Sequence, residues 1–320
     1  MDTQSTLAME GLPQKPEKPL DSDCCGNGCV PCVLDIYAEE LAIWERECAR
    51  IKSGGTSHSV GQEEEENGEY ESPALSSSEY HQYQITAVIP ETHDTWRFTC
   101  RLGPDQSLGL LPGQHVVIRG YVEGKPITRQ YTPVSDVRLK GAFHLLIKVY
   151  RDGRMSQVVR TCQVGDGLEI RGPFGCLQYT PNQYSRVLML AAGTGVAPMA
   201  QLIQAMLTNE DEEGRVRLLY ACRTYHDILM KSEIAEWRQF WNFSATFLLS
   251  QEPPTETPSG QYQYGEEIVH GKINKTLLEK ELGKNVSGTR VLVCGTRSFD
   301  SDMLQILDVC NFPKDHIFKF

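Results

Sequence analysis

The feature that most constrains the fold is a change near Gln183 in the pattern of predicted strands and helices. Between residues 81 and 182, short segments rich in β-branched and aromatic residues alternate with Gly and Pro, as in "YQITAVI", "GQHVVIRG" and "FHLLIKVYR". Such segments predict a small antiparallel β-barrel. Beyond Gln183, strand patterns such as "SRVLMLAAG" and "TRVLVCG" alternate with helical patterns such as "APMAQLIQAMLTN". This alternation predicts a doubly wound parallel α/β sheet, with a ligand crevice at the carboxyl ends of its strands.

The first quarter of the chain has a different composition. Residues 1–22 mix Pro, Lys and Glu and are expected to be disordered, and residues 53–80 have the low hydrophobicity of an acidic linker. Between them, Asp35 can cap a helix with one apolar face, made of Tyr37, Leu41, Trp44, Cys48 and Ile51. That face must be buried against the rest of the chain or against a partner. The expected domains are therefore residues 1–22, 23–52, 53–80, 81–182 and 183–320.

Charge is unevenly distributed along the chain. The formal net charge is -11, and residues 1–80 contain 5 Lys and Arg against 17 Asp and Glu, whereas residues 81–320 contain 26 against 25. No basic stripe suggests nucleic-acid binding. No apolar run reaches the roughly 20 residues of a membrane span, and "MDTQSTLAME" has neither a secretory signal nor a myristoylation site. We expect an intracellular, cytoplasmic protein, with a mitochondrial or membrane-peripheral location as the alternative.

Three turn-rich segments have residues suited to a phosphorylated cofactor. In "AAGTGVAP", residues 191–198, glycines join a strand pattern to a helix pattern, and a helix N-terminus offers N–H groups to a pyrophosphate. The spacing differs from G-x-G-x-x-G, and the segment could equally be a tight turn. In "RQYTPVS", Arg129 can bind a phosphate, Tyr131 can lie against a flat ring and Thr132 can hydrogen-bond a ring nitrogen. The turn "GRMSQ", residues 153–157, opens a second expected helix.

Taken in order, these motifs resemble the ferredoxin reductase superfamily and, within it, the NADH-cytochrome b5 reductase family. Arg129, Tyr131 and Thr132 match the flavin motif R-x-Y-T/S, and "KVY...GRMSQ" matches "KVY...GKMSQ". "RGPFG" follows, then "AAGTGVAP" for the family's "GGTGITP", and "VLVCGTRSF" stands where "CGPPPM" is expected. The aromatic C-terminus, Phe320, also fits. The resemblance spans about three-quarters of the chain and implies FAD and NADH as cofactors.

The resemblance also implies a role for each matching residue. Arg129 would hold the FAD phosphates, Tyr131 would pack against the flavin and Thr132 would lie near its N5. The FAD pyrophosphate would be wrapped by Gly153, Arg154, Met155 and Ser156, and the nicotinamide crevice would be bordered by Gly193, Thr194, Gly195 and Pro198. Lys148 matches a lysine that helps NADH bind, and Cys294 matches a cysteine near the hydride-transfer position. Thr132 and Cys294 form the predicted catalytic pair, and Ser135, Tyr150 and Gly295 complete the predicted cofactor-binding set.

This chain departs from the family pattern in the crevice. The two prolines of "CGPPPM" are replaced by Thr296 and Arg297, which predicts looser positioning of the nicotinamide. Gln251 stands about where the family carries an Asp that disfavours the 2′-phosphate of NADPH, and Arg223 could accept that phosphate. We expect NADH as the electron donor, with NADPH as the alternative.

A cysteine-rich run, "DCCGNGCVPCVLDIY", precedes the first helix and resembles a short oxidoreductase-like N-terminal module. The chain has eleven cysteines, and without a secretory signal we expect most of them to be reduced. The candidate metal ligands are Cys24, Cys25, Cys29 and Cys32. A zinc ion or iron–sulfur cluster, a redox or disulfide clip, and a protein-docking element all stay open for this run.

The histidines have no spacing that indicates a metal site. We interpret His81, His93, His115 and His144 as surface residues or hydrogen-bonded core residues.

Three functional hypotheses follow from the sequence. The first is an FAD-dependent reductase that takes a hydride from NADH and passes single electrons to a haem protein such as cytochrome b5. The second is the same flavoenzyme with another acceptor, such as a centre bound by the cysteine module. The third is an interaction protein with bound but silent FAD.

Overall fold

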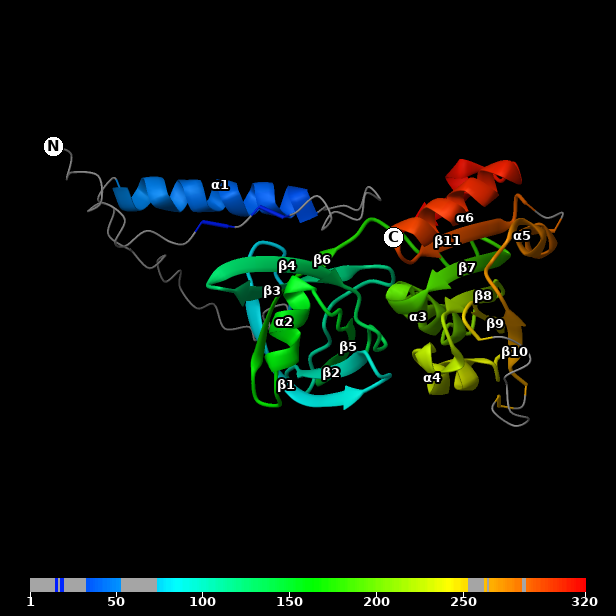
Figure 1. Cartoon of the computed structure of the whole chain (residues 1–320), viewed down its shortest axis with the longest axis horizontal. Helices are drawn as coiled ribbons and strands as arrows, with labels where there is room; N and C mark the ends of the chain where they lie inside the picture. Colours follow the sequence, from blue (N-terminus) through cyan, green and yellow to red (C-terminus); the bar gives the residue numbers. More distant parts are fainter. Residues whose placement is uncertain are drawn as a thin grey trace.

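Two bodies lie side by side in the computed structural model, with a long helix across the first of them (Figure 1). The structure describes residues 15–16, 18–19, 33–52, 74–252, 262–263, 265–283 and 286–320. The first body is a β-barrel, and the second is an α/β sheet with helices on both faces. The expected fold class, an antiparallel barrel followed by a doubly wound sheet, is confirmed.

Antiparallel strands build the barrel. Among the described residues they form one sheet in the order β4-β3-β6-β1-β2-β5. Their bounds are β1 (His81–Pro90), β2 (Thr95–Arg101), β3 (His115–Val122), β4 (Lys125–Tyr131), β5 (Ala142–Lys148) and β6 (Gly167–Phe174). An isolated bridge between Pro133, just after β4, and Leu145 in β5 brings the two edge strands together. The sheet therefore curls into a barrel, and its inward side chains, such as Ile85, Phe98 and Ile118, form one buried core.

A short helix, α2 (Arg154–Thr161), packs on the barrel wall formed by β3 and β4. Met155 and Val159 point into the barrel core, because they lie four residues apart on one face of the helix. The start of α2 is thereby held next to the loop that follows β4.

The second body contains a parallel sheet in the order β10-β9-β8-β7-β11-β12 over the described residues. The strands are β7 (Arg186–Ala192), β8 (Arg215–Cys222), β9 (Phe243–Leu249), β10 (Glu267–His270), β11 (Thr289–Cys294) and β12 (Ile317–Lys319). The chain moves outward from β7 to β10 and then returns to pair β11 with the other side of β7. The carboxyl ends of β7 and β11 thus meet at the point where the strand order reverses, which is where open α/β sheets bind ligands.

Helices cover both faces of this sheet. The helices are α3 (Val196–Leu207), α4 (Lys231–Trp237), α5 (Lys275–Leu282) and α6 (Arg297–Val309). Residues of α3 and α4 share one buried core with one face of the sheet, and residues of α5 and α6 share a second core with the other face. The central strands are buried on both faces, which explains why they appear in the sequence as continuous apolar runs.

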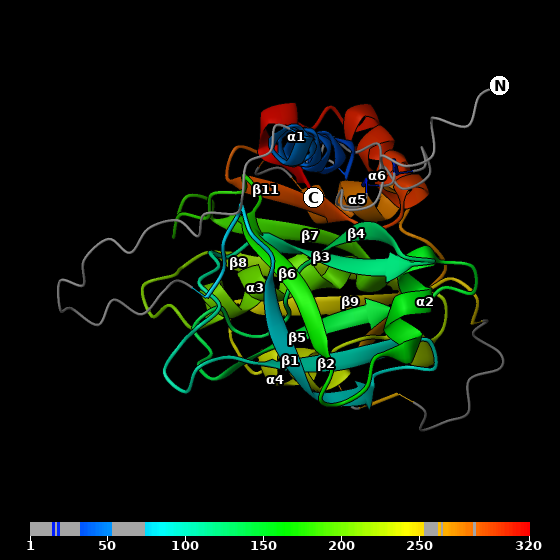
Figure 2. The ribbon, with the colours of Figure 1, turned by 90° about the vertical axis from the view of Figure 1, so that its left-hand side faces the viewer.

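Helix α1 (Val33–Lys52) confirms the expected helix and lies across the barrel, where it contacts β4 (Figure 1; Figure 2). Ile36 and Cys48 are buried, and the Tyr80 hydroxyl donates a 2.8 Å hydrogen bond to Glu40 of α1. The expected cap is wrong, because the helix begins at Val33 and Asp35 lies in its first turn. A carboxylate there still stabilises the helix, since it faces the positive end of the helix dipole.

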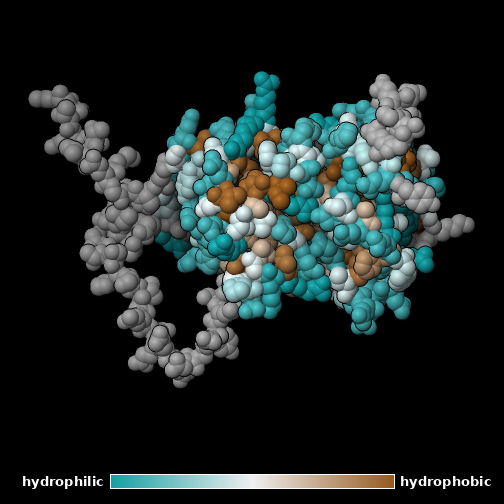
Figure 3. All heavy atoms as spheres, turned by 90° about the horizontal axis from the view of Figure 1, so that it is seen from below, coloured by the Kyte–Doolittle hydropathy of each residue, from teal (hydrophilic) through white to brown (hydrophobic). Residues whose placement is uncertain are grey.

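Most of the surface seen from below is hydrophilic, and a hydrophobic area gathers on the half that holds the barrel (Figure 3). None of the described helices is both long enough and apolar enough to cross a membrane.

Candidate functional site

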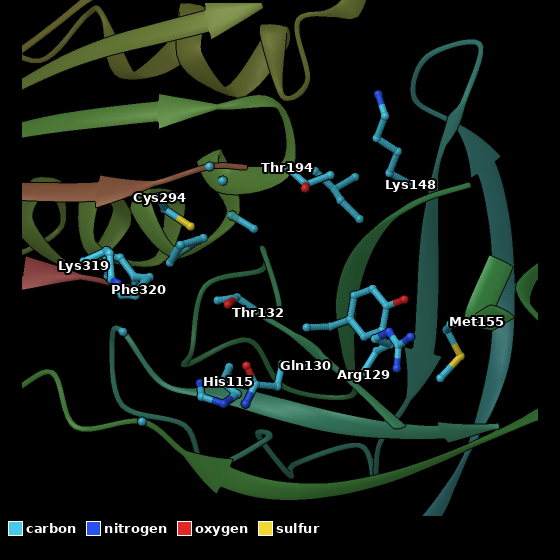
Figure 4. Close-up of a pocket in the computed structure, with 18 of the residues that line it drawn as sticks. His115, Arg129, Gln130, Thr132, Lys148, Met155, Thr194, Cys294, Lys319 and Phe320 are labelled. Carbon is cyan, nitrogen blue, oxygen red and sulfur yellow. The ribbon is translucent and has the colours of Figure 1, made fainter. Parts of the chain in front are cut away.

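A cavity of about 500 Å³ lies between the barrel and the α/β sheet. From the barrel it is lined by the loop after β4, the end of β5 and the start of α2, and from the sheet by the turns after β7 and β11 and by the C-terminus. We call it the interdomain cavity (Figure 4). It contains fourteen of the residues that the sequence predicts: Arg129, Tyr131, Thr132, Lys148, Tyr150, Gly153, Arg154, Met155, Ser156, Thr194, Gly195, Pro198, Cys294 and Gly295.

The end of β4 supplies the side chains predicted to contact the flavin. Thr132 lies near the centre of the cavity, between Cys294 on one side and Arg129 and Met155 on the other (Figure 4). The Arg129 guanidinium donates a 2.7 Å hydrogen bond to the Thr128 carbonyl, which holds its stem against the strand. Burial raises the pKa of the Tyr131 hydroxyl, so Tyr131 is neutral and suited to lie against a flat, uncharged ring.

The start of α2 forms a cradle for an anion. Gly153 precedes the helix, and no side chain among the described residues caps it. The backbone N–H groups of the first turn, which have no helical acceptor, are thus available to a phosphate. Ser156 accepts a 2.9 Å hydrogen bond from the Tyr150 amide, and a Cβ at Gly153 would lie 2.6 Å from the Ser156 hydroxyl oxygen. Glycine is therefore required for this tight approach.

The turns after β7 and β11 pack backbone against backbone. A Cβ added to Gly195 would overlap the Cys294 carbonyl oxygen and lie 2.6 Å from its carbon. At Gly295 an added Cβ would lie 2.5 Å from the Phe299 ring and 3.0 Å from the Ala192 Cβ. The two glycines let the turns meet and place Thr194 and Cys294 on one wall of the cavity. Glycine is thus required at these positions because β7 and β11, which lie about a hundred residues apart in the sequence, are neighbours in the sheet.

The "CGTRSF" loop, which lacks the family's prolines, begins helix α6. The Thr296 hydroxyl caps α6 by accepting a 3.3 Å hydrogen bond from the Phe299 amide. Looser positioning of the nicotinamide stays a prediction. The cap at Thr296 stabilises the first turn of α6, at the position where the family has its prolines.

Lys148 lies at the edge of the cavity, and its amine points away from Arg129 and Met155 (Figure 4). Its Nζ forms a 2.7 Å ion pair with Asp94, in the loop between β1 and β2. Burial opposes ionisation of Asp94, but the hydrogen bond and charge of Lys148, together with the hydrogen bond from Thr95, outweigh it and lower the pKa of the carboxyl.

Two predicted residues do not line the interdomain cavity. Ser135 is buried and accepts a 3.1 Å hydrogen bond from the His144 amide, which joins the loop after β4 to β5. Gly193 adopts a positive φ of 54°, and its carbonyl accepts a 2.9 Å hydrogen bond from the Tyr220 hydroxyl. Both residues shape the loops that carry the site. The candidate ligands Cys24, Cys25, Cys29 and Cys32 lie outside the described residues.

His115 was expected to be a surface or hydrogen-bonded core residue, and this expectation is wrong. It lines the interdomain cavity, and its buried Nε2 has no hydrogen-bond partner among the described residues. Burial lowers the pKa of His115 to about 4, so the imidazole is neutral. By contrast, His81 contacts the Ala74 carbonyl and His144 contacts the Thr99 hydroxyl, as expected.

Gln201 on α3 was missed because a polar residue in an apolar helix has no motif. It is buried, accepts a 2.9 Å hydrogen bond from the Gly113 amide and donates a 3.0 Å one to the Pro133 carbonyl. It thereby joins the sheet domain to the barrel at two places, just before β3 and just after β4. Phe318, Lys319 and Phe320 also line the cavity, because β12 pairs with β11 and brings the C-terminus to the crevice.

Comparisons with known proteins agree with this geometry. Residues 82–179 match the oxidoreductase FAD-binding domain, residues 189–304 match the oxidoreductase NAD-binding domain, and residues 10–53 match the N-terminal domain of oxidoreductase-like proteins. The chain is 38% identical to the NADH-cytochrome b5 reductase-like protein of Mus musculus, over 96% of this chain and 95% of the relative. The Homo sapiens protein of the same name is 37% identical, over 96% and 94%.

A solved structure gives the same result. The cytochrome b5 reductase domain of Ulva prolifera nitrate reductase superposes with a TM-score of 0.69 at 28% identity, and covers 78% of this chain and 100% of that domain. The hypothesis of an interaction protein without catalysis is therefore set aside. The chain belongs to the NADH-cytochrome b5 reductase-like family of oxidoreductases, with an FAD-binding domain, an NAD-binding domain and an oxidoreductase-like N-terminal module.

Proposed function

We propose that this FAD- and NADH-dependent reductase passes single electrons to a haem protein of the cytochrome b5 type. One observation carries the use of both cofactors: a single cavity is lined by the end of β4 and the loop after it, and also by the turns after β7 and β11. FAD, when bound, supplies the chemistry that converts a two-electron donor into a one-electron donor. The acceptor is inferred from relatives named as NADH-cytochrome b5 reductases, including one from Dictyostelium discoideum that is 33% identical over 84% of this chain.

The residues of the barrel would bind and orient the flavin. Arg129 and the N–H groups at the start of α2 would hold its phosphates, because both are aimed at the same cavity from neighbouring elements. Tyr131 would pack against the ring, and Thr132 would offer a hydroxyl near its centre. These contacts would position the cofactor without a charged side chain at the reacting atoms.

The residues of the sheet would present the nicotinamide to the flavin. Thr194, Pro198 and Cys294 line the wall opposite Arg129, and the contact between Gly195 and Cys294 keeps that wall close-packed. Phe320 lines the same space, and its ring contacts Phe318 edge-on with the centroids 5.0 Å apart. These side chains would exclude water, which favours direct transfer between two oriented rings.

The proposal is tested with the purified, FAD-loaded chain, NADH and two acceptors, ferricyanide and cytochrome b5. Ferricyanide reports NADH oxidation regardless of protein docking, so it serves as the internal control. Cytochrome c, a basic haem protein, serves as the matched acceptor of opposite charge. We expect cytochrome b5 to be reduced well above the cytochrome c background. Rapid ferricyanide reduction together with background rates for both haem proteins would reject the cytochrome b5 type of acceptor and favour another one.

A further inference from the structure

The two domains also meet along a polar seam outside the interdomain cavity. We use "polar seam" for the contacts between residues 91–97 of the barrel and residues 223–233 of the sheet domain. The Met230 amide donates a 2.7 Å hydrogen bond to Glu91, Arg97 pairs with Glu233 at 2.6 Å, and Arg223 pairs with Asp94 at 3.2 Å. Each of these contacts joins the barrel to the sheet domain. The polar seam therefore determines which charged side chains of the two domains are neighbours.

Asp94 is the most connected carboxylate in the seam. Its Oδ1 accepts hydrogen bonds from the hydroxyls of Thr92 (3.2 Å) and Thr95 (3.0 Å), which fix the side chain. Its Oδ2 faces the Lys148 amine at 2.7 Å and the Arg223 guanidinium at 3.2 Å. One fixed, ionised oxygen therefore holds a cation from each domain.

Arg223 lies between two carboxylates. Besides Asp94, it faces Asp227 Oδ1 at 3.9 Å, and the other oxygen of Asp227 is held by the amide and hydroxyl of Thr224. The cations Lys148 and Arg223 are thus balanced by the anions Asp94 and Asp227. His93, which also faces both carboxylates, is mostly exposed and adds a charge only when protonated.

Arg223 lies at the position of the sheet where a bound dinucleotide would place its ribose, so its charge partners bear on nucleotide binding. Arg223 directly follows β8, the neighbour of β7, and its carbonyl accepts a 2.8 Å hydrogen bond from the Gln251 amide. In dinucleotide-binding sheets, the residues after the strand next to the glycine turn meet the ribose 2′ position, and an arginine there accommodates a 2′-phosphate. Here that arginine is already paired, and half of its side chain is exposed.

We propose that Asp94 and Asp227 are the residues that make this chain prefer NADH to NADPH. A 2′-phosphate brings a charge of about -2 to a cluster whose charges cancel, so it gains little attraction and is repelled by both carboxylates. A 2′-hydroxyl is uncharged, so the two carboxylates do not repel it. Asp94, from the barrel, and Asp227, from the turn after β8, would thus disfavour the 2′-phosphate. A carboxylate at position 251 would have the same effect by facing the phosphate directly. The proposal rests on the use of a nicotinamide dinucleotide and not on the identity of the electron acceptor.

Binding of two nucleotides that differ only in the 2′-phosphate tests this directly. We would titrate the FAD-loaded full chain with 2′,5′-ADP and with 5′-AMP by calorimetry, and compare the ratio of their affinities between the wild type and Asp94→Asn. Loss of one nearby charge is expected to shift this ratio about tenfold toward 2′,5′-ADP at low salt, and less at high salt. Asp227→Asn should act in the same direction. The ratio of kcat/KM for NADPH over NADH, measured with ferricyanide, should follow.

Two further variants separate this role from a general loosening of the seam. Glu91→Gln removes the same charge from the same seam, but Glu91 faces Arg97 and the Met230 amide and not Arg223, so it should leave the nucleotide ratio unchanged. Arg223→Gln in the Asp94→Asn background should abolish the gain. Equal shifts in Asp94→Asn and Glu91→Gln, no shift in Asp94→Asn, or a gain that survives loss of Arg223 would each overturn the proposal. The titration needs no haem acceptor, so failure of the acceptor proposal gives a different result.

Discussion

Replacing Gly195 with Ala should disrupt the wall of the interdomain cavity. The new Cβ would lie 2.6 Å from the Cys294 carbonyl carbon and 3.0 Å from the Gly295 nitrogen, and these are backbone atoms that no rotamer change can move. Carbon atoms in favourable contact are about 3.5–4.0 Å apart, so the turns after β7 and β11 would have to separate by about 1 Å. Overpacking of this kind costs about 1–3 kcal/mol of stability. A displacement of about 1 Å in an active site can cost about a hundredfold in rate.

Gly193→Ala is the matched control for this change. Gly193 lies in the same turn and has a positive φ of 54°, but nothing lies within 4 Å of its added Cβ. Its replacement should therefore cost only about 1 kcal/mol of backbone strain. We would measure the Tm of both FAD-loaded variants and their kcat/KM for NADH with ferricyanide. If the Tm and the kcat/KM of Gly195→Ala equal those of Gly193→Ala, the close contact between the two turns does not affect stability or activity, and the reasoning is refuted.

Two further predictions concern pH and the acidic run at residues 63–66. Burial lowers the pKa of His115 to about 4, below about 6.5 in the unfolded chain. The unfolded chain therefore binds the extra proton between pH 6.5 and 4, and the free energy of unfolding falls as pH falls. The contribution is about 2 kcal/mol between pH 7 and pH 5, and urea unfolding at both pH values should show a smaller loss in His115→Gln; an equal loss in both proteins would contradict it. Replacing Glu63, Glu64, Glu65 and Glu66 by Gln should speed reduction of acidic cytochrome b5 at low salt and leave ferricyanide reduction unchanged, because it removes negative charge and leaves the sequence of α1 as it is. Rates that match the wild type at every ionic strength would reject an electrostatic role for these four residues.

The flavin-binding elements were largely predictable because their signals are local. Alternation of apolar residues predicts the strands of the barrel, and a glycine directly before "RMSQ" predicts the start of α2. The short edge strands β10 and β12 were not predicted, since β12 spans Ile317–Lys319 and acquires its strand character only by pairing with β11. Its position explains how Phe320 reaches the cavity.

Other parts of the site have no local signal. His115 and Gln201 are single polar residues in apolar surroundings, and only packing reveals that one lines the cavity and the other joins the two domains. The partners of Arg223 were equally hidden, because Asp94 lies 129 residues away in the chain. From its position in the sequence, the Arg223 guanidinium is a candidate for binding a 2′-phosphate, whereas in the structure it is paired with a carboxylate of the other domain.

By itself the sequence determined the two domain types, the flavin motif and the glycine turns, since backbone conformation and hydrophobic periodicity depend on neighbouring residues. Only the tertiary structure decided which of these segments share one space. Contact between Gly195 and Cys294, the position of the C-terminus and the balance of charge around Arg223 all depend on chain segments brought together by sheet order and by domain docking. Such contacts are not encoded in the spacing of residues along the chain, because they result from closing long loops around a common core.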